Sequence, residues 1–271
     1  WVTFGAQIDE PTAICLIKEA FDQGINYFDN ADMYAGGQAE VVMGKAIADI
    51  PREELVISSK VFWPTFKGPN GRGLSRKHIT ESIHASLKRL GVEYIDLYFC
   101  HRFDPDTPME EVVRTMTDLV QQGKILYWGT SEWDASQIVL AHGVARQYGL
   151  IPPTMDQPQY NILHRKRVED TVMPVVRELG LGLTTFSPLY YGILTGKYNN
   201  GIPRGSRASL EDYSWIRDRI TPERVEIVKC LTNVANELDI TPAQLAIAWI
   251  LHRKEVSSVI TGATRLEQLD E

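Results

Sequence analysis

Short apolar runs alternate with longer amphipathic stretches along most of this chain of 271 residues. The apolar runs have the length of buried parallel strands, and the amphipathic stretches repeat their apolar positions with the period of a helix. We predict strands at residues 1–4, 25–29, 55–60, 94–101, 124–129, 154–157, 181–187 and 257–261, and helices at 11–23, 38–49, 75–90, 108–122, 134–148, 165–179, 222–238 and 242–252. Eight strands with intervening helices predict an α/β fold, the (β/α)₈ TIM barrel, as one domain over residues 1–271.

Polar caps and glycines support these boundaries. Ser75 is an N-cap candidate before the third helix, and Gly91 follows the end of that helix. Glycine also ends the next three helical patterns, at Gly123, Gly149 and Gly180. The stretch 188–221, after the seventh predicted strand, breaks the rhythm and reads as a long irregular loop. Loops of this length are usually functional, so we expect it to be a lid or a cofactor-binding loop.

The charge excludes some classes of partner. The formal net charge of -7 argues against nonspecific binding to nucleic acid or to an anionic membrane, although a local basic patch for a phosphate-bearing ligand stays open. No apolar run approaches the roughly 20 residues that span a bilayer, and we find no basic-then-apolar pattern of a leader in the sequence. Cys15, Cys100 and Cys230 have no metal-binding spacing, which is typical of packed thiols in a reducing compartment. We therefore expect a cytoplasmic protein. The chain opens abruptly at Trp1 and stops at Glu271 in an apparent helix, so we expect both ends to be trimmed.

Four polar residues lie where chemistry is done in such a barrel. Asp29, Lys60 and His101 close predicted strands, and Tyr34 lies just beyond the first of these. The carboxyl ends of parallel strands meet at one end of the barrel, so we expect these side chains to lie together. Lys60, held by Asp29, could lower the pKa of the Tyr34 phenol and make it a better general acid. Each residue type alone is more often structural, but their joint placement favours carbonyl reduction.

His101 has two roles open to it, which are donating a hydrogen bond to a substrate carbonyl and exchanging protons with the tyrosine. The other histidines have no metal-ligand spacing, so no metal is indicated. A metal-dependent hydrolase would need several ligands at strand ends, and only Asp29, His101 and Asp156 qualify. Lys60 would oppose a cation there.

Common nucleotide-binding and nucleophile motifs are absent from the sequence. The turn after the last strand, Gly262 to Gln268, contains an arginine and leads into a predicted helix start. Barrels often bind phosphate after their last strands, so this turn is a candidate phosphate site.

Over essentially its whole length the sequence resembles the aldo-keto reductase superfamily, in the branch of the voltage-gated potassium channel beta subunits and their microbial and plant relatives. The stretches that carry the resemblance are 24–29, 34–35 with 39–44, 72–79, 127–131, 186–189, 206–210 and 242–249. The resemblance implies that Asp29, Tyr34, Lys60 and His101 form the catalytic tetrad. Tyr34 would then protonate the carbonyl oxygen while hydride arrives from NADPH.

The resemblance also implies a set of NADPH contacts. Ser131 and Gln157 would bond the carboxamide, and Phe186 would stack on the nicotinamide ring. The rest of the dinucleotide would lie over Trp1, Gln7, Asp29, Ser187, Pro188, Leu189 and Lys197, with Arg207, Gly262, Thr264, Arg265, Gln268 and Glu271 toward the adenosine phosphate. Arg207 and Arg265 favour NADPH over NADH, because an arginine can bind the 2′-phosphate with two hydrogen bonds.

The sequence departs from the family pattern at several positions. Animal channel subunits have asparagine at the position of His101, so the histidine favours an efficient reductase. Glu132 and the pair Tyr190 and Tyr191 replace other residue types near the cofactor loop and the pocket. The N-terminal hairpin of the family is missing, which we attribute to trimming.

Two functions stay open at this stage. The first is an NADPH-dependent reductase of aldehydes or ketones, with Phe62, Trp63, Tyr190 and Tyr191 either shaping the substrate pocket or simply packing. The second is an NADPH-binding regulatory or redox-sensing subunit with slow turnover, which could be a homotetramer and have a channel as its partner.

Overall fold

A computed structural model of the chain describes residues 7–270. These residues form two compact units. The first comprises residues 7–157, 175–182 and 262–270, and the second comprises 158–174 and 183–261. The predicted strand at residues 1–4, and the predicted cofactor contacts Trp1 and Glu271, lie outside the described residues.

Five parallel strands organise the first unit. They follow one another in chain order as β1 (Tyr27–Asp29), β2 (Val56–Val61), β3 (Ile95–Cys100), β4 (Ile125–Thr130) and β5 (Met155–Asp156). The register pairs Asp29 with Ser58, Lys60 with Phe99, and Phe99 with Gly129. The polar residues at the strand ends therefore come to one edge of this sheet.

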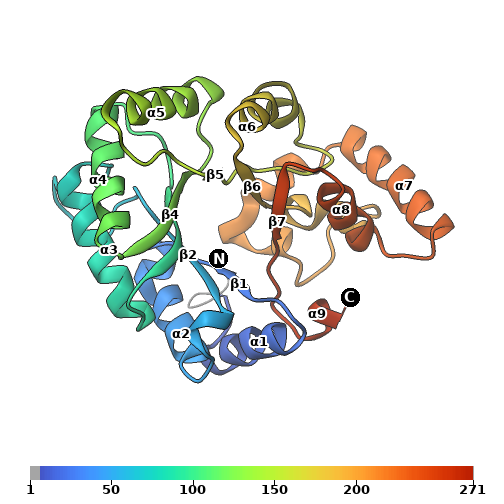
Figure 1. Cartoon of the computed structure of the whole chain (residues 1–271). Helices are drawn as coiled ribbons and strands as arrows, with labels where there is room; N and C mark the ends of the chain where they lie inside the picture. The colour runs from blue at the N-terminus through green and yellow to red at the C-terminus, as the bar shows by residue number, and fades with distance from the viewer. Residues whose placement is uncertain (1–6, 271) are drawn as a thin grey trace. The chain divides into compact units, whose positions relative to one another are not determined.

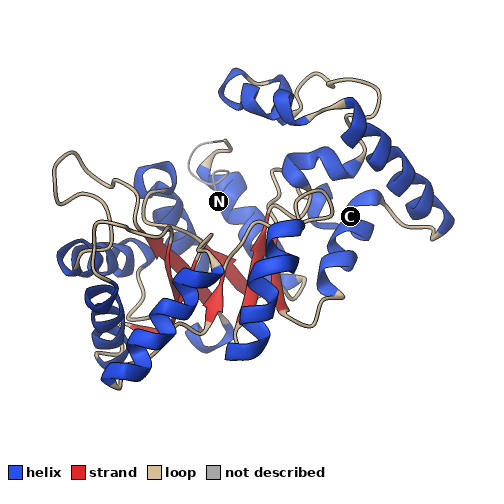
Figure 2. Ribbon diagram, turned by 90° about the horizontal axis from the view of Figure 1, so that it is seen from above, coloured by secondary structure: helices blue, strands red, loops and turns tan. Residues whose placement is uncertain are grey.

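Helices lie on the outer side of these strands (Figures 1 and 2). They are α1 (Glu10–Asp22), α2 (Gln38–Ile47), α3 (Arg76–Leu90), α4 (Met109–Gln121), α5 (Ala135–Tyr148) and the short α9 (Glu267–Asp270). The unit also contains 3₁₀ turns at Tyr34–Gly37 and Arg52–Glu54. The predicted caps are present: the Ser75 hydroxyl accepts a hydrogen bond from the His78 amide at 3.3 Å, and Gly91 adopts the left-handed conformation.

A glycine allows β4 and β5 to approach each other closely. A Cβ atom on Gly129 would lie 2.5 Å from the carbonyl oxygen of Met155 and 2.7 Å from its Cγ. No side chain larger than hydrogen fits there without moving backbone. Gly129 thus brings the ends of β4 and β5, which carry Ser131 and Gln157, close together.

The second unit contains β6 (Gly182–Phe186) paired in parallel with β7 (Val256–Ile260), together with α7 (Pro222–Glu237) and α8 (Pro242–Leu251). A π-helical turn, Val168–Val172, precedes α6 (Met173–Leu179). An apolar cluster that includes Tyr190, Tyr198 and Val228 forms the core of this unit.

The parallel α/β class predicted from the sequence is confirmed, and each predicted strand within the described residues is found. The segment 188–221 is less irregular than predicted, since it contains 3₁₀ helices at Tyr190–Thr195, Arg207–Ser209 and Glu211–Arg219. These turns bury Ile193, Ala208 and Ile216 in the core of the second unit, and this burial stabilises the turns. The description as one domain stays a prediction. Within residues 7–270, no helix is long and apolar enough to span a bilayer.

Candidate active site

The strand ends of the first unit bring three of the predicted catalytic residues together. Asp29 is the last residue of β1, and Lys60 lies next to the end of β2. His101 directly follows β3 and continues its ladder, because its amide donates a hydrogen bond to the Val61 carbonyl at 3.0 Å. The sheet therefore fixes these backbone positions independently of the side chains.

Lys60 and Asp29 form a buried ion pair. The Lys60 Nζ lies 2.6 Å from Asp29 Oδ2, and the two side chains are 0% and 6% exposed. Lys60 also donates to the backbone carbonyl of Asn30 at 2.6 Å. Burial lowers the pKa of Lys60, whereas the Asp29 carboxylate acts to raise it.

The second oxygen of Asp29 is also occupied. It accepts hydrogen bonds from Ser58 Oγ at 2.7 Å and from Gln157 Nε2 at 3.0 Å. Tyr27 in turn donates its hydroxyl to Ser58 at 3.2 Å. The carboxylate is thus held in one orientation, and the lysine it pairs with is held with it.

Tyr34 lies against this pair. Its side chain is buried, and the Lys60 Nζ lies 5.0 Å from the centroid of its ring. The residue begins a 3₁₀ turn in which the next residue, Ala35, has a φ of 49°. A left-handed alanine is strained, and such strain often occurs at functional sites.

The expectation that Lys60 would lower the pKa of Tyr34 is not met. Burial, followed by the Asp29 charge, raises the pKa of Tyr34 well above its usual value. Burial disfavours the charged phenolate, and the nearby negative charge of Asp29 disfavours it further. Tyr34 therefore holds its proton over the whole physiological range.

His101 faces the tyrosine. Their ring centroids are 5.8 Å apart and the planes meet at 80°. Burial, then the charges of Lys60 and Arg102, lower the pKa of His101 well below its usual value, so the imidazole is neutral. Within the described residues its buried Nδ1 has no hydrogen-bond partner.

Two aromatic residues named as pocket candidates from the sequence, and an arginine that the sequence did not single out, flank this histidine. The Trp63 ring lies 6.3 Å from the His101 ring and 5.0 Å from the Phe62 ring. The Arg102 guanidinium lies 5.8 Å from the Trp63 ring and donates a hydrogen bond to the His101 carbonyl. Its position directly after His101 was the only signal in the sequence.

The groups expected to bond a nicotinamide carboxamide are adjacent in the first unit. Ser131 donates its hydroxyl to the Gln157 carbonyl at 2.9 Å, and the Gln157 side chain reaches Asp29. A hydroxyl and a side-chain amide can both donate and accept hydrogen bonds, as the carboxamide does. These residues fit a nicotinamide next to the tetrad.

The second unit contains another group of the predicted cofactor residues. Phe186 ends β6, and Ser187 adopts a φ of 54°. Pro188, Leu189, Lys197 and Arg207 follow in the segment of 3₁₀ turns, where the Arg207 guanidinium lies 5.6 Å from the Tyr213 ring. Tyr190 is buried in the core of this unit, in agreement with the packing alternative.

The tyrosine after it, Tyr191, packs against Trp215 with ring centroids 4.8 Å apart. Its φ of 61° places a bulky side chain in the left-handed region, as at Tyr190.

The remaining predicted contacts lie at the ends of the first unit. Gly262, Arg265 and Gln268 are exposed, and the Gln268 side chain accepts a hydrogen bond from the Thr264 amide at 2.8 Å. Gln7 is half-buried near the start of the described chain. Among residues 7–270, no cluster of three or more His, Cys, Asp or Glu side chains could hold a metal ion.

Two buried acidic residues near Tyr34 and Lys60, Asp32 and Glu40, could not be identified from the sequence pattern. Asp32, between Asp29 and Tyr34, accepts a hydrogen bond from Ser82 and is 2% exposed. Burial raises the pKa of Asp32 to about 7. The neighbouring Glu40 is fully buried and bonds Arg89 at 2.7 Å. These contacts join residues far apart in the sequence, so no local motif marks them.

Comparisons with known proteins show the family to which the chain belongs. The model of the aldo/keto reductase family matches residues 1–271. A protein of Arabidopsis thaliana named "Probable voltage-gated potassium channel subunit beta" is 49% identical over 275 residues, which cover 100% of this chain and 84% of that protein. A protein of the same name from Oryza sativa is 48% identical with the same coverage. One from Schizosaccharomyces pombe, also described as a channel beta subunit, is 50% identical over 279 residues and covered to 81%.

Proposed function

Because this chain belongs to the aldo/keto reductase family, whose fold is the (β/α)₈ barrel, we propose that it is an NADPH-dependent oxidoreductase that reduces aldehydes or ketones to alcohols. The observation that carries the proposal is the buried pair of Lys60 and Asp29, with the Tyr34 and His101 rings beside it. A buried ion pair, a protonated phenol and a neutral imidazole are suited to delivering a proton to a carbonyl oxygen.

His101, Tyr34 and Lys60 would each have a separate role in this proton transfer. His101, which is neutral, donates a hydrogen bond to the carbonyl oxygen and orients it. As negative charge develops on that oxygen, the Tyr34 hydroxyl transfers its proton to it. The alkoxide is a stronger base than a phenolate, so this transfer is favourable even though the pKa of Tyr34 is raised. Lys60, fixed by Asp29, stabilises the phenolate that is left, which then takes a proton from solvent.

The cofactor, when bound, supplies the hydride that adds to the carbonyl carbon. Ser131 and Gln157 would hold the carboxamide, because their hydroxyl and amide groups lie together beside Asp29. Phe186 would stack on the nicotinamide, and Arg207 and Arg265 would bind the 2′-phosphate. These assignments come from the family pattern of the residues.

We also propose that the protein is located in the cytoplasm.

The test follows the oxidation of NADPH with an activated aromatic aldehyde, in the wild type and in Tyr34→Phe. The variant removes one oxygen and should lower kcat by about a thousandfold or more, since proton transfer by a positioned side chain contributes about 10²–10⁴-fold. The dissociation constant of NADPH should stay within about twofold. Undiminished turnover in Tyr34→Phe would remove the tyrosine from the mechanism.

A second candidate is an NADPH-binding subunit of a potassium channel, in which turnover would be slow and the occupancy of the site by NADPH would be the signal. The names of the relatives from Arabidopsis thaliana and Oryza sativa favour it. A wild type that binds NADPH tightly, sediments as a tetramer and turns over aldehydes less than about once a minute would support this function over the reductase.

A further inference from the structure

A positive charge lies next to the candidate catalytic groups, and the mechanism above does not use it. Arg102 is half-buried and is held by the His101 carbonyl and by the Trp63 ring. Its charge reaches the tetrad, because it is one of the causes that lower the pKa values of His101 and Lys60, after the larger effect of burial in each case. An arginine placed there disfavours cations and favours anions in the site.

A second arginine extends this positive region. The Arg72 guanidinium lies 5.9 Å from the Phe62 ring, and Phe62 packs on Trp63. Within residues 7–270, neither Arg72 nor Arg102 makes an ion pair with a carboxylate.

Within residues 7–270, the carboxylate of Asp104 bonds neutral donors and forms no ion pair with Arg72 or Arg102. Its Oδ2 accepts hydrogen bonds from the Leu74 amide at 2.7 Å and from the Thr107 hydroxyl at 2.8 Å. Its Oδ1 accepts one from the Asp106 amide at 3.1 Å. Asp104 therefore serves to fix the two loops, and the arginines keep their capacity for a ligand.

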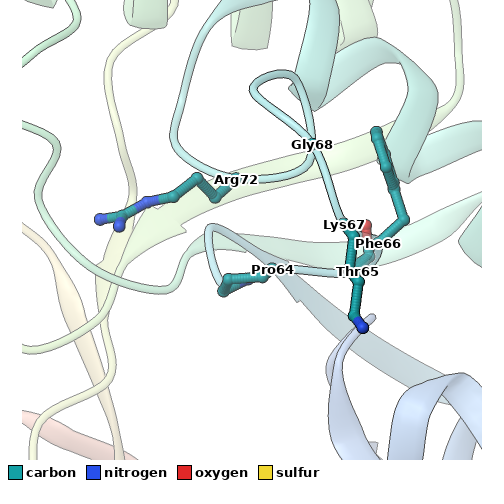
Figure 3. Close-up of a pocket in the computed structure, with 6 residues that line it drawn as sticks. All are labelled: Pro64, Thr65, Phe66, Lys67, Gly68 and Arg72. Atoms are coloured by element: carbon teal, nitrogen blue, oxygen red, sulfur yellow. The ribbon is translucent and has the colours of Figure 1, made fainter.

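Backbone contacts cross-link the loop that carries Arg72. The Thr65 amide donates to the Gly71 carbonyl at 3.1 Å, and a Cβ atom on Gly71 would lie 2.4 Å from the Phe66 carbonyl oxygen. Residues of this loop, among them Pro64, Lys67 and Arg72, line a pocket (Figure 3). The Arg72 side chain points away from Phe66 and Lys67. Lys67 also lines this pocket and is a second cation in the loop.

We propose that the substrates of this site are carbonyl compounds that also carry a carboxylate, with Arg102 as the contact of the carboxylate and Trp63 against the planar apolar part. This inference rests on the proposed reductase function. The reaction itself is unchanged: the carbonyl carbon gains a hydride, its oxygen gains the Tyr34 proton, and the carboxylate takes no part in bond making. Arg72 and Lys67 would attract the anion to the site from solution.

Two aldehydes that differ by one charge test the inference. We would compare kcat/KM for para-carboxybenzaldehyde and for the neutral methyl para-formylbenzoate, in the wild type and in Arg102→Gln. Both aldehydes use the same tetrad, so any effect of the substitution on Tyr34 or His101 cancels in the ratio of acid to ester. The ratio should fall by about 10- to 100-fold, the usual worth of a hydrogen-bonded charge.

Two further variants sharpen this test. Arg102→Lys keeps the charge but loses the planar fork, so its ratio should fall between those of the wild type and Arg102→Gln. Arg146→Gln removes an exposed positive charge from α5 and should leave the ratio unchanged. An equal ratio in the wild type and in Arg102→Gln would overturn the inference.

A binding measurement separates this inference from the proposed function. Titration with para-(hydroxymethyl)benzoate, followed by NMR, reports carboxylate binding without turnover. If the wild type binds it, Arg102→Gln loses at least about tenfold in affinity and neither aldehyde is reduced, then the reductase proposal fails and the carboxylate site stands. If Arg102→Gln weakens NADPH by the same factor as the carboxylate, Arg102 belongs to the cofactor site and the inference is wrong.

Discussion

Replacing Asp29 by asparagine would remove one negative charge and little volume from beside Lys60. The two charges are 2.6 Å apart, so at an effective dielectric constant of about 20 their attraction is about 6 kcal/mol. The neutral asparagine is cheaper to bury than the carboxylate, which returns part of this energy. Removal of one partner from a buried pair typically costs about 3–5 kcal/mol, and we expect Asp29→Asn to fall in this range.

The loss should depend on pH, because Lys60 can escape by losing its proton. Burial already lowers the pKa of Lys60 in the folded protein, and without Asp29 it should fall further. Between this lowered pKa and the ordinary value of about 10.4, the unfolded chain binds more protons than the folded one, so stability rises with pH. Asp29→Asn should therefore lose most at pH 6 and less at pH 9.

Urea unfolding of four proteins would measure this: the wild type, Asp29→Asn, Lys60→Met and the double variant. At pH 6 the free energy of unfolding of Asp29→Asn should fall by about 3 kcal/mol or more. The double variant should regain much of it, since an apolar side chain of similar length replaces the stranded charge. A fall below about 1 kcal/mol at both pH values would refute the reasoning that the pair is desolvated.

A surface pair provides the control for this cycle. Lys45 and Glu10 are 2.7 Å apart, about as close as the buried pair, but their side chains are 53% and 44% exposed. Glu10→Gln should cost no more than about 1 kcal/mol and should show little dependence on pH. The comparison isolates the effect of burial from that of distance.

Four further measurements test other parts of the structure. Arg207→Ala should weaken NADPH by about tenfold and NADH by much less, and equal losses of affinity would remove Arg207 from the phosphate site. Because the folded pKa of Asp32 is raised to about 7, the folded state binds the extra proton between pH 3.8 and 7, and wild-type stability falls as pH rises through this window. Asp32→Asn mimics the protonated acid, so its stability relative to the wild type should increase from pH 5 to pH 8; a constant difference would contradict the raised pKa. Since His101 stays neutral, the plot of kcat/KM against pH should show no inflection near pH 6.5. An inflection in the wild type that is absent from His101→Asn would show that the histidine titrates there. Gly129→Ala should destabilise the protein by about 1–3 kcal/mol, whereas Gly143→Ala, in the middle of α5 with open space around it, should stabilise it by up to about 1 kcal/mol. Equal changes in thermal stability for the two glycine variants would exclude the close approach of β4 and β5.

The strands and their polar ends could be predicted because the signals are local. The run that ends at His101 is apolar enough to be a buried strand, and it forms β3 within one residue of its predicted bounds at each end. Once strands are parallel and in chain order, the ladder itself brings Asp29, Lys60 and His101 to one edge. The proximity of these residues therefore followed from pattern and topology alone.

What the sequence could not supply depends on burial and on distant partners. The pKa of Tyr34 is raised because the phenol is buried and the Asp29 charge lies near it, and the extent of this burial is not visible in residue spacing. Asp32 meets Ser82 across 50 positions of sequence. Arg102 carries no pattern of its own, since an arginine after a strand is usually solvated.

The charges of the tetrad suggest why Arg102 matters most for the choice of substrate. Lys60 and Asp29 cancel each other, Tyr34 keeps its proton and His101 is neutral, so these four groups together carry no net charge before a substrate binds. Such a set can stabilise charge that develops during the reaction, but it exerts little attraction on a substrate in its ground state. The unpaired charge of Arg102 acts on the bound substrate throughout. Catalysis and selection of the substrate are therefore assigned to different residues, and substitutions should be able to change one without abolishing the other.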